Sequence, residues 1–153
     1  MTPLDLGWVV GMFEGEGSIS IGTKRNEIAM AMCSTDEDVV RRFHNLVSCG
    51  TVVGPHSTNG NKDQFTWRSS TNDSERLLRL FLPLLGNRRA ARATEALQAR
   101  QDYKDLCTQE RICPQCNTSF RPSYNLGAFK KVYCSKTCKW NKWNSTRSDR
   151  VAA

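Results

Sequence analysis

The hydrophobic pattern of the first hundred residues changes repeatedly between the period of a helix and that of a strand. Helices are predicted over residues 4–16, 36–47, 72–82 and about 88–103. Strands are predicted over Ser18–Gly22, Ile28–Cys33, Gly50–Pro55 and Gln64–Ser69. The order helix, strand, strand, helix, strand, strand, helix, helix predicts an α+β fold with antiparallel hairpins.

Polar residues mark where the predicted helices begin. Thr2 is in position to cap the first helix, with Pro3 in its first turn. Ser34 or Thr35 is expected to cap the second helix, and Asn72-Asp73-Ser74 the third. Such side chains accept hydrogen bonds from the free N–H groups of a first helical turn, so they fix its position.

Composition and charge indicate a globular protein with a polyanionic partner. Of the 153 residues, 39% are hydrophobic and 24% are charged, which argues against disorder and fibrous repeats. The apolar run Leu6–Phe13 is too short to span a bilayer, and acids follow it where a secretory signal would end. An intracellular protein without a membrane span is therefore expected. The net charge of +7 is carried by residues 111–153, which hold nine basic residues and one acid. This excess favours nucleic acid as the partner.

The first predicted helix carries two features that are unusual in a structural helix. Gly7, Gly11 and Gly15 share one face, although each glycine costs about 1 kcal/mol relative to alanine in a helix interior. Close approach of a second helix, for example from another subunit, would offset this cost. Glu14 and Glu16 lie in the last turn, where the helix dipole disfavours negative charge. A bound divalent cation such as Mg²⁺ would reverse that preference, and paired metals are used for phosphodiester hydrolysis.

These residues carry a resemblance to a known family. The nonapeptide Val9-Val10-Gly11-Met12-Phe13-Glu14-Gly15-Glu16-Gly17 resembles the LAGLIDADG motif of homing endonucleases, and Trp8 and Ser18-Ile19-Ser20-Ile21 are also typical of that family. The resemblance covers roughly residues 1–103, because the order of elements matches as well. It implies an αββαββα domain with a four-stranded antiparallel sheet. Since the motif occurs once, it also implies a homodimer that cuts double-stranded DNA.

The resemblance also implies roles for the residues of the motif. Glu16 matches the second acid of the motif, which is the Mg²⁺ ligand, and Gly15 matches the residue whose carbonyl can face the metal. Glu14 matches the first acid, which is usually structural, and we include it among the candidate catalytic residues. The face of Gly7, Gly11 and Gly15 would form the dimer interface.

Two further positions of the family pattern concern residues that assist cleavage. At the start of the second helix the family often has Gln, Lys or Arg, whereas this chain has Thr35-Asp36. After Pro83-Leu84-Leu85 the family often has Lys, and here Arg88 and Arg89 follow. Arg88 is the candidate for stabilising charge on the reacting phosphate, because an arginine cannot act as a base at working pH.

The sheet of this family is its DNA-reading surface, and alternate side chains of a two-stranded ribbon can reach base edges in the major groove. Residues on the predicted strands and their turns are the candidates for this role, or else belong to solvated hairpin tips. They are Ser20, Lys24, Arg25, Asn26, Lys62, Gln64 and Arg68.

The C-terminal segment contains a zinc-binding pattern. Cys113 and Cys116 are followed, after 17 residues, by Cys134 and Cys138. Two close pairs separated by a loop are typical of a four-thiolate structural Zn²⁺ site, which has no open position for catalysis. The segment resembles zinc-ribbon or treble-clef fingers. Lys130, Lys131 and Lys139 are expected to contact DNA phosphates, and Trp140 and Trp143 either to pack the small core, which we favour, or to stack on bases.

The sequence therefore predicts an endonuclease domain over residues 1–105 and a basic four-Cys finger with its tail over residues 106–153. The expected activity is Mg²⁺-dependent cleavage of both strands of a specific DNA site. Two alternatives remain open at this stage. The first is a binder on the same fold that does not cleave, either a transcription regulator or an RNA maturase. The second is a zinc-dependent interaction module.

Overall fold

The computed structural model describes residues 1–23, 25–57, 62–122 and 131–151, with side chains up to residue 144 in the last range. The chain forms two compact units, Met1–Arg100 and Gln101–Ala153. No helix within the described ranges is both long enough and apolar enough to cross a membrane.

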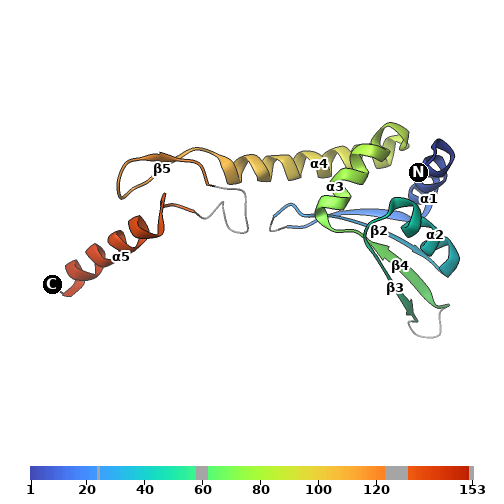
Figure 1. Cartoon of the computed structure of the whole chain (residues 1–153), viewed down its shortest axis with the longest axis horizontal. Helices are drawn as coiled ribbons and strands as arrows, with labels where there is room; N and C mark the ends of the chain where they lie inside the picture. Colours follow the sequence, from blue (N-terminus) through green and yellow to red (C-terminus); the bar gives the residue numbers. More distant parts are fainter. Residues whose placement is uncertain (24, 58–61, 123–130, 152–153) are drawn as a thin grey trace. The chain divides into compact units, whose positions relative to one another are not determined.

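The first unit is built on a four-stranded antiparallel sheet (Figure 1). Its strands are β1 (Gly17–Ile21), β2 (Ile28–Ser34), β3 (Thr51–His56) and β4 (Gln64–Arg68), and they pair in the order β1-β2-β4-β3. Two hairpins thus lie side by side, joined through β2 and β4 at the centre of the sheet. The predicted α+β architecture with antiparallel hairpins is confirmed.

Four helices accompany this sheet. They are α1 (Pro3–Glu16), α2 (Glu37–Val47), α3 (Thr71–Phe81) and α4 (Asn87–Thr108), with a short 3₁₀ turn, η1 (Leu82–Leu84), before α4. The predicted cap of α1 is confirmed, because the Thr2 hydroxyl accepts from Asp5 N and the Asp5 carboxylate accepts from Thr2 N.

The predicted caps of the next two helices were wrong, the first by one or two residues and the second by two to four. Asp36 is the N-cap of α2, without a side-chain capping bond, where Ser34 or Thr35 was expected. Ser70 caps α3 by accepting from Asp73 N, in place of the expected Asn72-Asp73-Ser74. Caps are decided by single hydrogen bonds, and several adjacent polar residues can each make one.

The core lies between the helices and one face of the sheet. Alternate residues of β2, among them Met30 and Met32, are fully buried, as is Trp67 on β4. The rings of Phe43 and Trp67 meet edge-on with centroids 4.9 Å apart. Because side chains alternate along a strand, burial of this set leaves the opposite face of the sheet without a helical cover.

The second unit has little core of its own. It contains the two-residue strands β5 (Arg111–Ile112) and β6 (Ser119–Phe120), which pair with each other, and the helix α5 (Lys136–Val151). Its buried side chains, among the residues whose burial is described, are those of Tyr103, Cys107, Cys113 and Pro122. So few apolar groups do not offset the chain entropy lost on ordering such a segment, and another source of stability is needed.

Candidate active site and metal centre

The two acids at the end of α1 have different surroundings. Glu14 is held in place, because its carboxylate accepts from Gly86 N at 3.2 Å and lies 3.6 Å from Arg89 Nε. Glu16 is exposed, and within the described part of the chain its carboxylate makes no hydrogen bond or ion pair. Only Glu16 is thus available to bind a ligand without breaking a contact of the fold.

Arg89 supplies the positive charge that α1 lacks in its own last turn. Its guanidinium donates to the carbonyl oxygens of Glu14 at 2.7 Å and Gly15 at 3.4 Å, and also to that of Gly17. The side chain is only 12% exposed and comes from the first turns of α4, 75 residues away along the chain. Arg89 therefore compensates the carbonyls and the Glu14 charge at this helix end, whereas the described structure gives the charge of Glu16 no partner.

Arg89, which contacts the end of α1, is the neighbour of Arg88, the arginine chosen from the sequence. Arg88 is exposed, whereas Arg89 reaches the acidic end of α1. Adjacent residues of a helix point about 100° apart, so only one of the two can face α1. The pair was visible in the sequence, but its orientation was not.

We expect the substitution Arg89→Met to lower the free energy of unfolding by about 2–3 kcal/mol. It would leave the carbonyls at the end of α1 and the Glu14 carboxylate without a charged donor while keeping most of the side-chain volume. The matched control is Arg88→Met, for which a change within about 0.5 kcal/mol is expected at an exposed position. Urea denaturation of the three proteins measures both values, and equal losses for the two variants would contradict this assignment.

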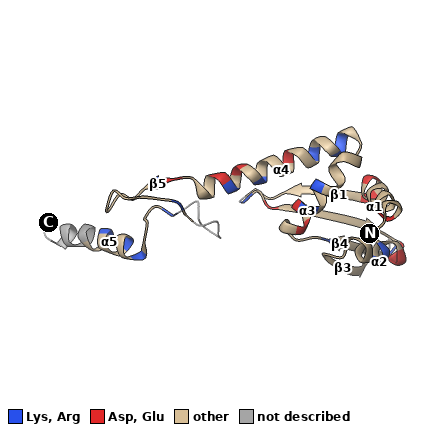
Figure 2. Ribbon diagram, turned by 45° about the horizontal axis from the view of Figure 1, so that its top comes forward, with Lys and Arg blue, Asp and Glu red and all other residues tan. Residues whose placement is uncertain are grey.

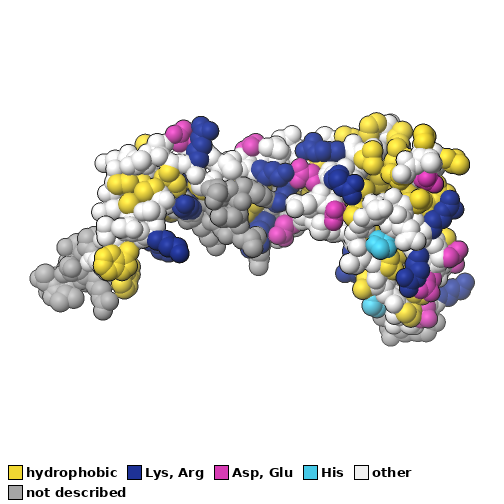
Figure 3. All heavy atoms as spheres, in the orientation of Figure 1, with side chains coloured by type: hydrophobic (Ala, Val, Ile, Leu, Met, Phe, Trp, Pro, Cys, Tyr) yellow, Lys and Arg dark blue, Asp and Glu magenta, His cyan; other side chains and the backbone are white. Residues whose placement is uncertain are grey.

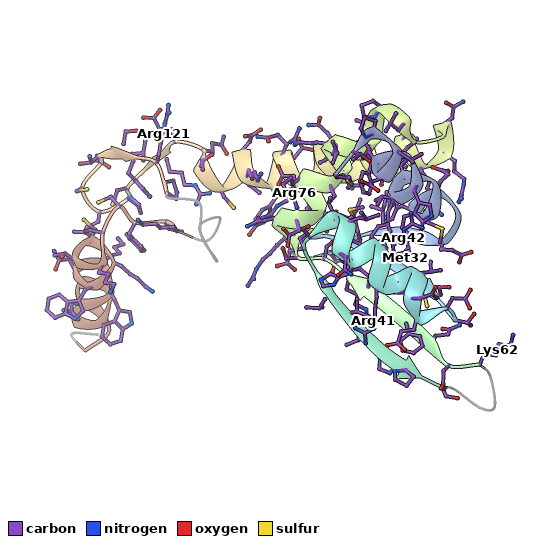
Figure 4. The ribbon with its side chains drawn as sticks, turned by 45° about the vertical axis from the view of Figure 1, so that its right-hand side comes forward. Met32, Arg41, Arg42, Lys62, Arg76 and Arg121 are labelled. Carbon is purple, nitrogen blue, oxygen red and sulfur yellow. The ribbon has the colours of Figure 1, made fainter. Side chains whose placement is uncertain are left out.

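The glycine face of α1 is open in the single chain. A Cβ built at Gly7, Gly11 or Gly15 would meet no atom within 4 Å. Leu4, at the start of the same helix, is 84% exposed. On the neighbouring side of α1, the Trp8 ring is covered by the Arg42 guanidinium of α2 at 4.1 Å (Figure 4). The glycines are therefore not required by packing within this chain.

The uncovered face of the sheet is lined mainly by small and polar residues. We call this surface the open face, and it consists of Ser18, Ser20, Ala29, Ala31, Cys33, Thr51, Val53, Gln64, Thr66 and Arg68. Cross-strand pairing places its members opposite one another in rows, one of which is Ser18, Ala31, Arg68 and Thr51. Three of the residues selected from the sequence share it, namely Ser20, Gln64 and Arg68. Ser18 and Thr66 were missed, although the two-residue period of the strands would have found them.

The candidates at the hairpin turns are placed differently. The Asn26 amide donates to the Ala99 carbonyl of α4 at 2.8 Å, and Arg25 lies 3.6 Å from Glu27. The amide of Asn26 is thus engaged in the fold. Lys62 lies near the end of the β3–β4 hairpin and is exposed (Figure 4). Lys24 lies outside the described residues.

The four cysteines selected from the sequence form one cluster. The Sγ atoms of Cys113, Cys116, Cys134 and Cys138 all lie within 4.8 Å of one another. The Cys116 and Cys134 sulfurs are 3.6 Å apart, and those of Cys134 and Cys138 are 3.5 Å apart. A tetrahedral Zn²⁺ with bonds of about 2.3 Å needs sulfurs about 3.8 Å apart, so the cluster fits this ion closely. The four thiols can therefore hold a metal of this kind.

The clustered thiols differ widely in their acidity. Burial opposes ionisation of Cys113, but N–H groups of Cys134, Gln115 and Cys116 donate to its sulfur and lower its pKa to about 6. The neighbouring sulfurs of Cys138 and Cys116 raise the pKa of Cys134 to about 12. Four thiolates at this distance repel one another, so a cation is needed to hold them all in the ionised form.

The described lysines that were selected in the second unit are exposed. Lys131 is exposed, with its ammonium 5.7 Å from the centre of the Phe120 ring, and Lys139 is exposed on α5. In the ribbon of Figure 2, the described part of α5 carries the colour of basic residues and none of the colour of acidic ones. Lys130 lies outside the described residues.

Comparisons with known proteins support the fold but add no relative at the sequence level. No protein-family model and no curated protein matches the chain. Among solved structures, the homing endonuclease I-CvuI in complex with its target in the presence of calcium is similar, with a TM-score of 0.52 and 17% identity over 69% of this chain and 71% of that one. The archaeal intron-encoded homing endonuclease I-Vdi141I, complexed with DNA, has a TM-score of 0.48 and 13% identity over 69% of this chain and 70% of that one. The likeness to I-CvuI confirms the predicted homing-endonuclease fold.

Proposed function

We propose that this protein is a site-specific endonuclease that binds double-stranded DNA as a homodimer and cuts both strands with Mg²⁺. The observation that carries the proposal is the exposed Glu16 carboxylate at the end of a helix whose glycine face is open. A carboxylate left at a negative helix end disfavours the isolated protein, and a cation bound there would remove that cost.

In the proposed site, Glu16 and the Gly15 carbonyl of each subunit would hold Mg²⁺. When bound, Mg²⁺ supplies an activated water and neutralises charge on the phosphate. Glu14 and Arg89 fix the position of this helix end. Arg88 is exposed in the first turn of α4, and its proposed role is to contact a phosphate. Glu14 thus acts by positioning its neighbours.

The open face of the sheet is the proposed DNA-contacting surface of the first unit. Gln64 and Arg68 are its long polar side chains, and both are exposed on β4. Arg can donate two hydrogen bonds to O6 and N7 of guanine, whereas Gln can donate one to N7 of adenine and accept one from its N6 amino group. The serines of β1 are short enough to let the sheet approach base edges or bridging water.

The glycine face of α1 is the proposed dimer interface. Two copies of α1 packed along this face would bring both Glu16 carboxylates to one region, as cleavage of two strands requires. The endonuclease domain is assigned to residues 1–105. The basic finger, residues 106–153, would extend the DNA contact by binding phosphates, with Zn²⁺ as its structural metal.

Adding a side chain to the glycine face is expected to separate the dimer. In a single chain Gly11→Leu has free space and should stabilise α1, because glycine is a poor helix former. In the dimer the same side chain prevents close approach, so we expect a monomeric mass by light scattering and loss of double-strand cleavage. The matched control, Asn45→Leu, adds leucine at an exposed position of α2 and should leave both properties unchanged. A Gly11→Leu protein that keeps the dimeric mass and full activity would contradict the interface.

One observation favours a second function, a nucleic-acid binder that does not cleave. The start of α2 carries Thr35 and the N-cap Asp36, both exposed, and provides no amide or cation to orient water near Glu16. A maturase or transcription regulator on this fold would need the sheet and the dimer but no metal at the helix end.

Cleavage of a randomised DNA library separates the two functions. The protein is incubated with the library in Mg²⁺, and the ends of the products are sequenced. Paired breaks at one recurring sequence, absent when the metal is omitted, are expected for the endonuclease. Sequence-specific retention of DNA without breaks would instead establish the binder.

A further inference from the structure

The two tryptophans of α5 lie on the surface of the second unit, and the expectation that they pack its core was wrong. Trp140 is 62% exposed and Trp143 is 58% exposed. Together with Lys136 and Lys139 they line a shallow groove of about 330 Å³. Figure 3 shows an apolar patch beside basic side chains on this unit. We call these four residues the tryptophan groove.

The placement of the groove follows from the helical period. Lys136, Lys139, Trp140 and Trp143 are spaced three, four and seven residues apart, so they share one face of α5. Cys138 lies on the opposite side of the same helix, toward the other cysteines of the cluster. The cysteine cluster and the tryptophan groove therefore lie on different faces of α5.

Charge indicates what the tryptophan groove binds. From Arg111 to Ser148 the sequence contains no Asp or Glu, while lysines border both tryptophans. Lysine ammonium groups attract phosphates, and indole rings stack on nucleobases because every base has a flat π face. An aromatic surface bordered only by cations is thus complementary to a nucleic-acid strand.

We propose that the tryptophan groove stacks on unpaired nucleobases of a nucleic-acid strand, with Lys136 and Lys139 holding the adjacent phosphates. In a B-form duplex the base faces are covered by neighbouring base pairs, and only the edges are accessible in the grooves. Indole rings can reach a base face only where the strand is single or a base has left the stack. The preference for unpaired bases distinguishes this site from the proposed duplex-binding sheet, and it does not depend on DNA cleavage.

The proposal is tested with the full-length protein carrying Glu16→Gln, so that any duplex stays intact. Fluorescence anisotropy measures binding of labelled oligothymidylate and oligouridylate of about 20 nucleotides and of a duplex of the same length. We expect Trp140→Leu and Trp143→Leu each to weaken single-strand binding about fivefold to a hundredfold, but to change duplex binding less than about twofold. The two single-stranded probes then show whether DNA or RNA is preferred.

Three controls separate stacking from folding. Trp140→Phe keeps an aromatic face and should retain most of the affinity, while Asn141→Ala, on another side of α5, should retain all of it. The metal content of each variant reports whether the second unit is folded. Independently of any substitution, single-stranded probes should quench tryptophan emission of the parent protein, because Trp67 is buried and the indoles of α5 are exposed.

Unchanged single-strand affinity in both leucine variants with normal metal content would overturn the proposal, as would equal losses for single strands and duplex. Absence of quenching would overturn it as well. The first result would indicate that the tryptophan groove serves a protein partner. None of these results bears on cleavage, which the library experiment measures separately.

Discussion

Substituting Glu16 by Gln is expected to lower the rate of double-strand cleavage at least about a thousandfold, because the amide does not replace a carboxylate as a ligand of Mg²⁺ and several kcal/mol of metal-derived stabilisation are lost. DNA binding through the sheet should persist. The free energy of unfolding should stay the same or rise by up to about 1 kcal/mol, since a negative charge leaves the C-terminal end of α1. Cleavage kinetics, anisotropy with duplex DNA and urea denaturation measure the three quantities.

The neighbouring substitution Glu14→Gln is the matched control. Its carboxylate accepts from Gly86 N and pairs with Arg89, so its loss should reduce stability, whereas the Glu16 carboxylate makes no such contact in the described structure. Glu14→Gln should therefore lower the free energy of unfolding, whereas Glu16→Gln should leave it unchanged or raise it. If Glu16→Gln cleaves at the parental rate, Glu16 does not hold the catalytic metal, and the proposed site is wrong.

Removal of the metal is expected to unfold the second unit. With only a handful of described buried side chains, this unit lacks a core that can maintain its structure, and a structural Zn²⁺ typically contributes about 10–16 kcal/mol of apparent binding free energy. We expect one Zn²⁺ per chain by elemental analysis. A strong chelator should remove it and lower the helical signal in circular dichroism by the contribution of α5.

The first unit should stay folded in the same experiment, because its core around Trp67 and Phe43 contains none of the four clustered cysteines. Cys116→Ser should reproduce the effect of the chelator. Cys33→Ser, on the open face of the sheet and outside the cluster, should bind the metal normally and serve as the control. Retention of the full helical signal by the metal-free protein would show that the second unit folds without zinc.

Several features of the protein follow from local sequence alone. The cap of the first helix at Thr2 and the αββαββα order depend on residues close together in the chain, and the structure confirms both. The four cysteines could also be identified from the sequence, because two close pairs flanking a loop need only one chain reversal to meet.

Other features depend on how a helix is rotated about its own axis relative to the elements against which it packs. The choice between Arg88 and Arg89 at the end of α1 is set by how α4 is rotated, and a change of one residue turns the side chain by about 100°. The same applies to Trp140 and Trp143, which composition suggested as core residues but which α5 turns outward. Composition indicates that a tryptophan can be buried, whereas only packing decides whether it is.

The sequence by itself determined the elements, their order, the acidic helix end and the four clustered cysteines, because periodicity, caps and ligand spacing are short-range properties. Tertiary structure alone decided that Glu14 is engaged while Glu16 is available, that Arg89 closes the end of α1, and that the tryptophans of α5 are exposed. Each of these depends on contacts between residues far apart in the chain or on the direction of a side chain, and neither is encoded in a local pattern.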